Sequence, residues 1–245
     1  MERGRRCLIR RIDFALAPGE IVGLVGPNGA GKSSLLTTLA GLAPEAAGEV
    51  TLDGQSLDNL GRRQIARRMG FLPQDSEDPY PATVLQTALI GRHPHIDFWR
   101  WESRADIAKA RSALRRMGLA QFAEREIATL SGGERRRLAI AAILAQAPRV
   151  YLLDEPLEAL DLAYQARVLR LLRRLADQHA AAILLSLHDL SVAARHADRV
   201  ILLDGEGGSD VGPADAVLQA DRLSHAYGCV MRCIEVEGSP YFITD

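Results

Sequence analysis

Glycines, a lysine and a serine near the N-terminus have the spacing that phosphate chemistry requires. The segment GPNGAGKSS at 26–34 matches the pattern G-x-x-x-x-G-K-[ST], with the strand-like run EIVGLVG before it and the apolar segment LLTTLAGL after it. In such a unit the glycines let backbone N–H groups point at phosphate oxygens, and the following helix adds the positive end of its dipole. The residues that fill the pattern are Gly26, Pro27, Asn28, Gly29, Ala30, Gly31, Lys32 and Ser33. The alternative is a glycine-rich loop that only turns the chain from strand to helix.

Two side chains of this segment are expected to act on a nucleoside triphosphate. Lys32 should reach the β- and γ-phosphates, and the Ser33 hydroxyl should ligate Mg²⁺. The chain has only one other lysine, Lys109, and its remaining basic side chains are arginine. A flexible point charge is therefore kept at the position where a planar guanidinium would not fit.

Acidic and polar side chains follow three later apolar runs. In VYLLDEP at 150–156, Asp154 is placed to hold Mg²⁺ through water, and Glu155 can aim at the γ-phosphate as the base for an attacking water. His188 follows the run AAILLSL and can bond the γ-phosphate or that water, because open α/β sheets bind ligands at the carboxyl ends of their strands. Gln74, in GFLPQD, could contact Mg²⁺ or water. The alternatives are an exposed acidic pair and a histidine satisfied in a turn.

The stretch LSGGE at 130–134 opens an apolar helix with two adjacent glycines. Ser131 and Glu134 have capping-box spacing, so one interpretation is that this stretch only starts a helix. A cap does not require two glycines, however. Gly132 and Gly133 would leave bare backbone N–H groups at the helix N-terminus, which is a second anion site. Two copies placed head to tail could each lend this surface to the phosphate loop of the other.

The elements that must position these residues alternate along the chain as in a parallel sheet covered by helices. Residues 1–75 predict strands plus the phosphate-loop helix, and residues 76–135 predict an inserted helical subdomain within one domain of 1–245. We expect its surface around 75–100 to dock a membrane subunit. Trp99 and Trp101 there could form a contact surface or ordinary core.

Composition excludes several classes of protein. Thirty basic and 31 acidic side chains leave a net charge of −1, so no global field favours nucleic acid or an anionic bilayer. Arginines at 3–11 and at 135–137 are expected to be solvated faces. The three cysteines have no metal-ligand spacing, which favours free thiols used as small apolar fillers. No leader peptide or run of about 18 apolar residues is present, so a cytosolic chain is expected.

In order and spacing, these motifs together resemble the ATP-binding subunit of an ABC transporter over essentially the whole chain. The resemblance implies a P-loop NTPase fold with a mixed sheet core, ATP and Mg²⁺ as cofactors, and hydrolysis with Glu155 as base and His188 beside it. It assigns ATP binding to 26–34, including Ser34, and to Gln74, and it assigns Mg²⁺ to Ser33, Gln74 and Asp154. The partner's nucleotide would contact Ser131, Gly132, Gly133 and Glu134, and Asp161 would lie at the dimer seam.

The stretches GRHPHIDFWRWES at 91–103 and LSHAYGCVMRCIEVEGSPYFI at 223–243 are similar to importers of metal chelates: iron-siderophore, haem or cobalamin. That resemblance implies a second copy of the chain, two transmembrane permease subunits and, indirectly, a periplasmic or extracellular substrate-binding protein as partners. It implies that the chain is peripheral on the cytoplasmic face of the inner membrane and that nucleic acid is not a partner. Where such subunits have an adenine-stacking aromatic residue, this chain has Arg3.

The alternatives are an ABC ATPase of another transport system and a soluble ABC protein that acts on ribosomes or DNA. Proteins of the latter kind typically fuse two units or insert long coiled coils, and this chain does neither. A P-loop kinase or GTPase is a third alternative, but LSGGE has no role there.

Overall fold

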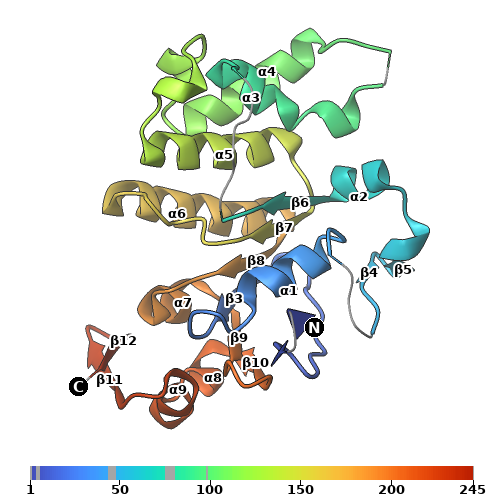
Figure 1. The fold of residues 1–245 in the computed structure, drawn as a ribbon. Helices are drawn as coiled ribbons and strands as arrows, with labels where there is room; N and C mark the ends of the chain where they lie inside the picture. Colours follow the sequence, from blue (N-terminus) through green and yellow to red (C-terminus); the bar gives the residue numbers. More distant parts are fainter. Residues whose placement is uncertain (1, 4–5, 44–47, 75–80, 98, 245) are drawn as a thin grey trace.

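A six-stranded sheet forms the centre of the protein. The computed structural model describes residues 2–3, 6–43, 48–74, 81–97 and 99–244. The strand order is β10-β9-β3-β8-β7-β6 (Figure 1), and all neighbours are parallel except β10, which pairs antiparallel with β9. The strands are β3 (Ile21–Val25), β6 (Met69–Leu72), β7 (Val150–Leu153), β8 (Ala182–Ser186), β9 (Arg199–Leu203) and β10 (Ser209–Pro213). This mixed sheet confirms the predicted α/β class.

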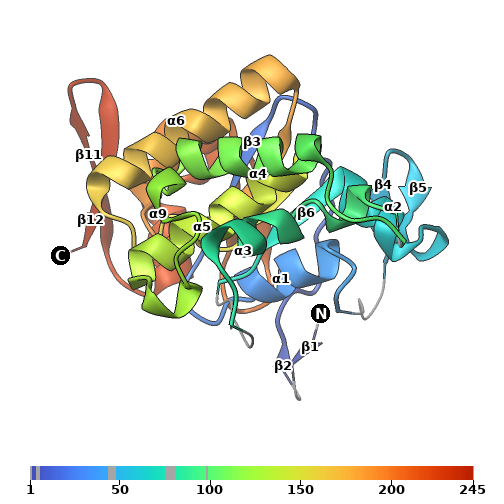
Figure 2. The same ribbon diagram turned by 90° about the horizontal axis from the view of Figure 1, so that it is seen from above.

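Both faces of the sheet are covered, because its central strands are apolar on both sides. In β3, Ile21 and Val25 belong to one core with residues of α5, α6 and α7, whereas Val22 and Leu24 belong to a second core with residues of α1. Alternate side chains of a strand point to opposite faces, which explains this division. Figure 2 shows α6 and α1 on opposite sides of the sheet. These helices are α1 (Lys32–Leu39), α5 (Gly132–Gln146), α6 (Leu162–His179) and α7 (Leu190–His196).

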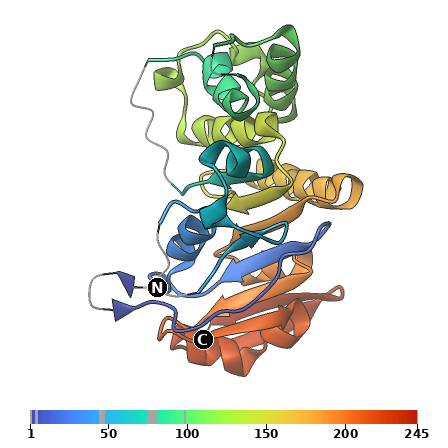
Figure 3. The ribbon, with the colours of Figure 1, turned by 90° about the vertical axis from the view of Figure 1, so that its right-hand side faces the viewer.

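Helices α3, α4 and α5 form a block at one end of the molecule (Figure 3). Each begins at a side chain that caps backbone N–H groups, namely Thr83, Ser103 and Ser131. Helix α4 ends before Gly118, whose φ of 68° suits glycine. The elements of this part are α3 (Val84–Ile90), α4 (Arg104–Arg116) and the 3₁₀ turns His93–His95, Ala120–Phe122 and Ile127–Thr129. The start of the expected 76–135 subdomain, residues 76–80, lies outside the described residues.

The remaining elements are short and lie around the sheet. The C-terminal hairpin of β11 and β12 packs on α7 and α9. These elements are β1 (Glu2–Arg3), β2 (Arg6–Cys7), β4 (Thr51–Leu52), β5 (Gln55–Ser56), the 3₁₀ turn Leu57–Asn59, α2 (Arg62–Arg68), α8 (Ala214–Val217), α9 (Ala220–Tyr227), β11 (Met231–Val236) and β12 (Ser239–Thr244). Through residues 2–3, 6–43, 48–74, 81–97 and 99–244, no helix has the length and apolar character needed to span a membrane.

The structure excludes one of the two alternatives for the tryptophans and corrects the expectation for two of the cysteines. Trp99 and Trp101 are 90% and 91% exposed, so neither belongs to the core. Cys229 and Cys233 are free thiols as expected, but both are exposed and so do not fill the core. The side chains of Arg3 and Cys7 lie outside the described residues.

Candidate functional site

The phosphate loop runs from the buried strand β3 into α1, as the sequence predicts. Gly26 (φ 146°), Gly29 (φ 80°) and Gly31 (φ 104°) all adopt conformations that favour glycine. At Gly26 a side chain is excluded by contact as well, since an added Cβ would lie 2.4 Å from the carbonyl oxygen of Leu203. Asn28 and Gly29 are exposed at the tip of the loop, and Ala30 is buried beneath it. The loop is therefore held by the sheet at its base and open to a ligand at its tip.

Lys32 folds back over this loop. Its Nζ donates to the carbonyl oxygens of Gly26 at 2.7 Å and Pro27 at 3.3 Å, and the residue is only 6% exposed. Burial lowers the pKa of Lys32, while the nearby carboxylates of Glu155 and Asp154 oppose that shift. The ammonium group thus lies between the loop and the acidic end of β7, where the phosphates of a nucleotide would meet it. Ser33 and Ser34, half-buried, follow in the first turn of α1.

Tyr227, which sequence reasoning missed, supports the start of the loop from the far end of the chain. The backbone N–H of Gly26 donates to its Oη at 3.1 Å. Burial raises the pKa of Tyr227 to about 12. The residue lies 201 positions away from Gly26, so no local pattern could have linked the two.

Asp154 and Glu155 leave β7 beside a buried serine on β8. Leu153 of β7 pairs with Leu185 of β8, so the next residues, Asp154 and Ser186, lie side by side at the carboxyl edge of the sheet. Ser186 Oγ donates to Asp154 Oδ1 at 2.6 Å and accepts from the Glu155 N–H at 2.7 Å. Asp154 is 2% exposed and Ser186 is fully buried. Ser186 was also missed; its place two residues before His188 in the same apolar run is the signal that could have found it.

Two of the side chains that the sequence placed at strand ends, His188 and Gln74, contact Glu155. His188 Nε2 lies 2.6 Å from Glu155 Oε1, and Gln74 Nε2 donates to Glu155 Oε2 at 3.0 Å. Glu155 is 7% exposed and has a φ of 48°, which takes its side chain out of the strand's alternation. Both carboxylate oxygens are therefore held by partners from two other strand ends. A carboxylate fixed in this way can orient and deprotonate a water, and His188, with its side chain 53% exposed, borders solvent.

The start of α5 combines a capping box with the glycine doublet. Ser131 Oγ accepts from the Glu134 N–H, and Glu134 Oε2 accepts from the Ser131 N–H at 2.9 Å. That backbone hydrogen bond is the main reason why the pKa of Glu134 lies below its usual value. Gly133 is packed, because an added Cβ would lie 2.8 Å from the carbonyl oxygen of Ala159, whereas a Cβ on Gly132 would meet nothing within 4 Å. Of the two glycines, Gly132 thus has open space where a side chain would stand, at the exposed end of the helix.

Asp161 caps the next helix. Its Oδ1 accepts from the Tyr164 N–H at 2.8 Å at the N-terminus of α6. The structure does not bring the Ser131–Glu134 stretch next to the phosphate loop of the same chain, since β6 and β7 lie between α5 and α1 (Figures 1 and 3).

Two of the three arginines at the start of α5, Arg136 and Arg137, do not lie on a solvated face. Arg136 is 8% exposed, and its guanidinium donates to the backbone of the segments that carry Gln74 and Glu155. Arg137 donates to the Met117 carbonyl oxygen at 3.1 Å. The expectation for 135–137 is therefore wrong for these two residues, because helix α5 turns them toward the protein.

The donor set fits a hard cation that arrives with a nucleotide. Ser33, Asp154 and Gln74 offer hydroxyl, carboxylate and amide oxygens, which Mg²⁺ prefers. Among the described residues, no three histidine, cysteine, aspartate or glutamate side chains cluster to hold a metal by themselves. Such a sparse set suits Mg²⁺, which usually keeps waters and substrate phosphates as ligands.

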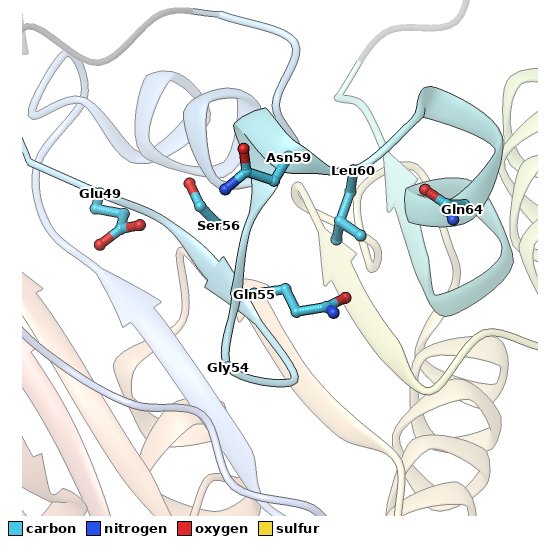
Figure 4. A pocket seen from close by; sticks show the side chains of 7 residues that line it. All are labelled: Glu49, Gly54, Gln55, Ser56, Asn59, Leu60 and Gln64. Carbon is cyan, nitrogen blue, oxygen red and sulfur yellow. The ribbon is translucent and has the colours of Figure 1, made fainter.

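A hollow elsewhere on the surface takes no part in this site. Figure 4 shows its lining residues, Glu49, Gly54, Gln55, Ser56, Asn59, Leu60 and Gln64, around β4 and β5. None of them belongs to the phosphate loop or to the Glu155 cluster. This hollow is therefore separate from the candidate site.

Comparison with curated proteins gives relatives over most of the chain. The hemin import ATP-binding protein of Myxococcus xanthus is 41% identical over 245 residues, which cover 97% of this chain and 91% of that protein. The cobalamin import ATP-binding protein of Halobacterium salinarum is 40% identical over 216 residues, covering 88% of this chain. The chain spans about half the length, 54%, of that protein.

Solved structures show the same fold. One described as a metal-chelate type ABC transporter in an inward-facing conformation has a TM-score of 0.82 and 30% identity, with 96% of this chain and 90% of that chain covered. A dimeric post-hydrolysis ATP-binding cassette bound to ADP and Pi has a TM-score of 0.76 and 25% identity, with 87% and 94% covered. The ABC transporter family model matches residues 9–158. The chain therefore belongs to the ABC transporter family and has the fold of its ATPase cassettes.

Proposed function

We propose that this protein binds and hydrolyses ATP with Mg²⁺ as one half of a dimer, and that it powers a membrane importer of a metal chelate. The observation that carries the proposal is the cluster around Glu155: a buried carboxylate held at both oxygens by His188 and Gln74, on the same sheet edge as Lys32. Such a cluster has little purpose in a protein that only binds nucleotide.

Each residue of the candidate site has a definite task in this mechanism. The backbone of 26–31 binds the β-phosphate, and Lys32 exchanges its bonds to the Gly26 and Pro27 carbonyls for bonds to the phosphates. Ser33, Asp154 and Gln74 would hold Mg²⁺, which neutralises charge that develops on the phosphates. Glu155 accepts the proton of the attacking water, and His188 keeps the carboxylate aimed at it. Ser186 fixes the backbone of the Asp154–Glu155 turn.

The second half of the site belongs to another copy of the chain. Support comes from the open space at Gly132 and from the separation of α5 from the phosphate loop within one chain. In a head-to-tail pair, Ser131, Gly132 and Gly133 bind the γ-phosphate of the partner's ATP, and Glu134 keeps Ser131 in place. Asp161, which caps α6 at the protein surface, lies at the seam.

The cargo and the further partners follow from the relatives. Proteins named for import of hemin, cobalamin and siderophores match most of the chain, so a haem, cobalamin or iron-siderophore complex is the proposed class of cargo. The partners would be two permease subunits and, indirectly, a substrate-binding protein, with this chain peripheral on the cytoplasmic face. The helical insertion at 76–135 would dock a permease subunit, and Trp99 and Trp101 offer exposed apolar surface for that contact.

The test replaces Glu155 with glutamine, which keeps the shape of the side chain and removes the base. Loss of general-base assistance should lower kcat by at least about 10²-fold while ATP binding is preserved, and the ATP-bound dimer should accumulate. Steady-state phosphate release and light scattering measure the two effects. Glu124→Gln, an exposed position 75% accessible on the helical block, is the control and should keep wild-type turnover. Wild-type hydrolysis by Glu155→Gln would refute the assigned base.

A further inference from the structure

The buried guanidinium of Arg136 joins the two segments that carry the reacting side chains. Its Nη1 donates to the carbonyl oxygens of Pro73 at 2.7 Å and Gln74 at 3.0 Å. Its Nη2 donates to the carbonyl oxygens of Asp154 and, at 2.8 Å, Glu155. Each terminal nitrogen therefore serves one segment: Nη1 the loop after β6, and Nη2 the turn after β7.

This geometry uses both terminal nitrogens of the planar guanidinium. The two terminal nitrogens carry four N–H groups, and four backbone carbonyls accept them. Because the guanidinium is rigid, it fixes the two segments relative to each other as well as satisfying their carbonyls. Their side chains, Gln74 and Glu155, meet at 3.0 Å directly beside it. The distance between those two side chains thus depends on a third element, helix α5.

Helix α5 also carries the surface that would contact the partner's nucleotide. Arg136 lies little more than one turn after its N-cap, Ser131. A single rigid helix thus connects the Ser131–Gly133 end to the backbone of Gln74 and of Glu155. Any movement of α5 relative to the sheet would be passed to both segments through these hydrogen bonds.

We propose that Arg136 is a positioning residue that sets Glu155 and Gln74 for hydrolysis according to where α5 lies. It acts through those two residues and does not touch the nucleotide. The inference rests on the proposed function, because it assumes that Glu155 is the base. It extends that function by naming a link within one chain. When a second copy binds at the N-terminus of α5, Arg136 transmits the resulting movement of α5 to Glu155 of the same chain.

The test compares two inward-turned arginines of the same helix. In Arg136→Met, kcat should fall about 10- to 100-fold because the base loses its alignment, while KM for ATP and the affinity for ADP stay within about threefold. In Arg136→Lys, kcat should lie between that of wild type and that of Arg136→Met, because an ammonium has three donors and no planar fork. Arg137→Met is the control: it removes a hydrogen bond to Met117, a contact with the Tyr164 ring and a 4.0 Å ion pair with Glu134. The other carboxylate oxygen of Glu134 keeps its hydrogen bonds from Ser131 in this variant, so kcat should stay within about twofold of wild type.

A double-substitution cycle keeps the test decisive if Arg136→Met does not fold. Arg136→Lys combined with Gln74→Ala should lose less than the product of the two single losses in kcat, because both act on Glu155. The proposal is overturned if Arg136→Met or Arg136→Lys turns over ATP at the wild-type kcat, if Arg137→Met loses as much, or if the losses multiply. Glu155→Gln separates the two levels: an active Glu155→Gln refutes the proposed function, whereas an inactive one beside a normal Arg136→Met refutes only the positioning role.

Discussion

Alanine at each glycine of the doublet, Gly132 and Gly133, should separate two roles that the sequence alone cannot distinguish. A Cβ at Gly133 would lie 2.8 Å from the backbone oxygen of Ala159, whereas one at Gly132 would meet nothing within 4 Å. Overpacking of this kind costs about 1–3 kcal/mol of unfolding free energy. Alanine in place of glycine gains up to about 1 kcal/mol of helix propensity at either position, and this gain cancels when the two variants are compared.

The expected result is a free energy of unfolding about 1–3 kcal/mol lower for Gly133→Ala than for Gly132→Ala. Urea unfolding of the nucleotide-free chain, followed by circular dichroism, measures this difference. Equal stability of the two variants would refute the reasoning, because it would mean that the turn at Ala159 yields without cost.

Gly132→Ala should instead affect association. Its methyl group would stand in front of the backbone N–H groups that the partner's γ-phosphate is proposed to contact. In the Glu155→Gln background, where the ATP-bound dimer should accumulate, addition of Gly132→Ala should therefore lower the dimer fraction at a given ATP concentration. Size-exclusion chromatography with light scattering measures that fraction. An unchanged fraction would remove Gly132 from the proposed contact.

Two further predictions concern a buried serine and a half-buried carboxylate. Ser186→Ala removes the hydrogen-bond partner of both Asp154 Oδ1 and the Glu155 N–H. It should therefore lower the free energy of unfolding, measured in urea, by about 2–5 kcal/mol. A loss below about 1 kcal/mol would contradict the role of Ser186 in holding this turn. The hydrogen bond from Ser103, followed by that from Arg92, lowers the pKa of Asp106 from 3.8 to about 2. The stability that this carboxylate contributes is therefore present above about pH 4 and lost as the pH falls through about 2; Asp106→Asn should show a flatter stability profile in that window, and an identical profile would contradict the prediction.

Local motifs made the central parts of the site predictable. The loop at 26–33 is contiguous in sequence with its strand and its helix, so its shape depends on nearby residues. Asp154 and His188 follow apolar strands, and parallel strands end at one edge of a sheet. That rule was enough to place His188 beside the Asp154–Glu155 turn, and the structure has it there.

Contacts between distant segments could not be predicted in this way. Arg136 lies 63 residues from Pro73, and Tyr227 lies 201 residues from Gly26, so neither hydrogen bond leaves a local pattern. A run of arginines also suggests a solvated face until the helix phase and the neighbouring backbone are known. The different surroundings of Gly132 and Gly133 likewise depend on Ala159, which belongs to another turn.

The most direct test of the account mixes two inactive variants. Lys32→Ala impairs the phosphate loop, and Ser131→Arg blocks the surface offered to the partner. In a head-to-tail pair of one copy of each, one site contains both defects and the other contains neither. Each variant alone should be inactive, whereas an equimolar mixture should recover up to about a quarter of wild-type turnover, since half of the pairs are mixed and each has one intact site. A mixture that stays inactive, or a Ser131→Arg variant that hydrolyses ATP at the wild-type rate by itself, would contradict the shared site.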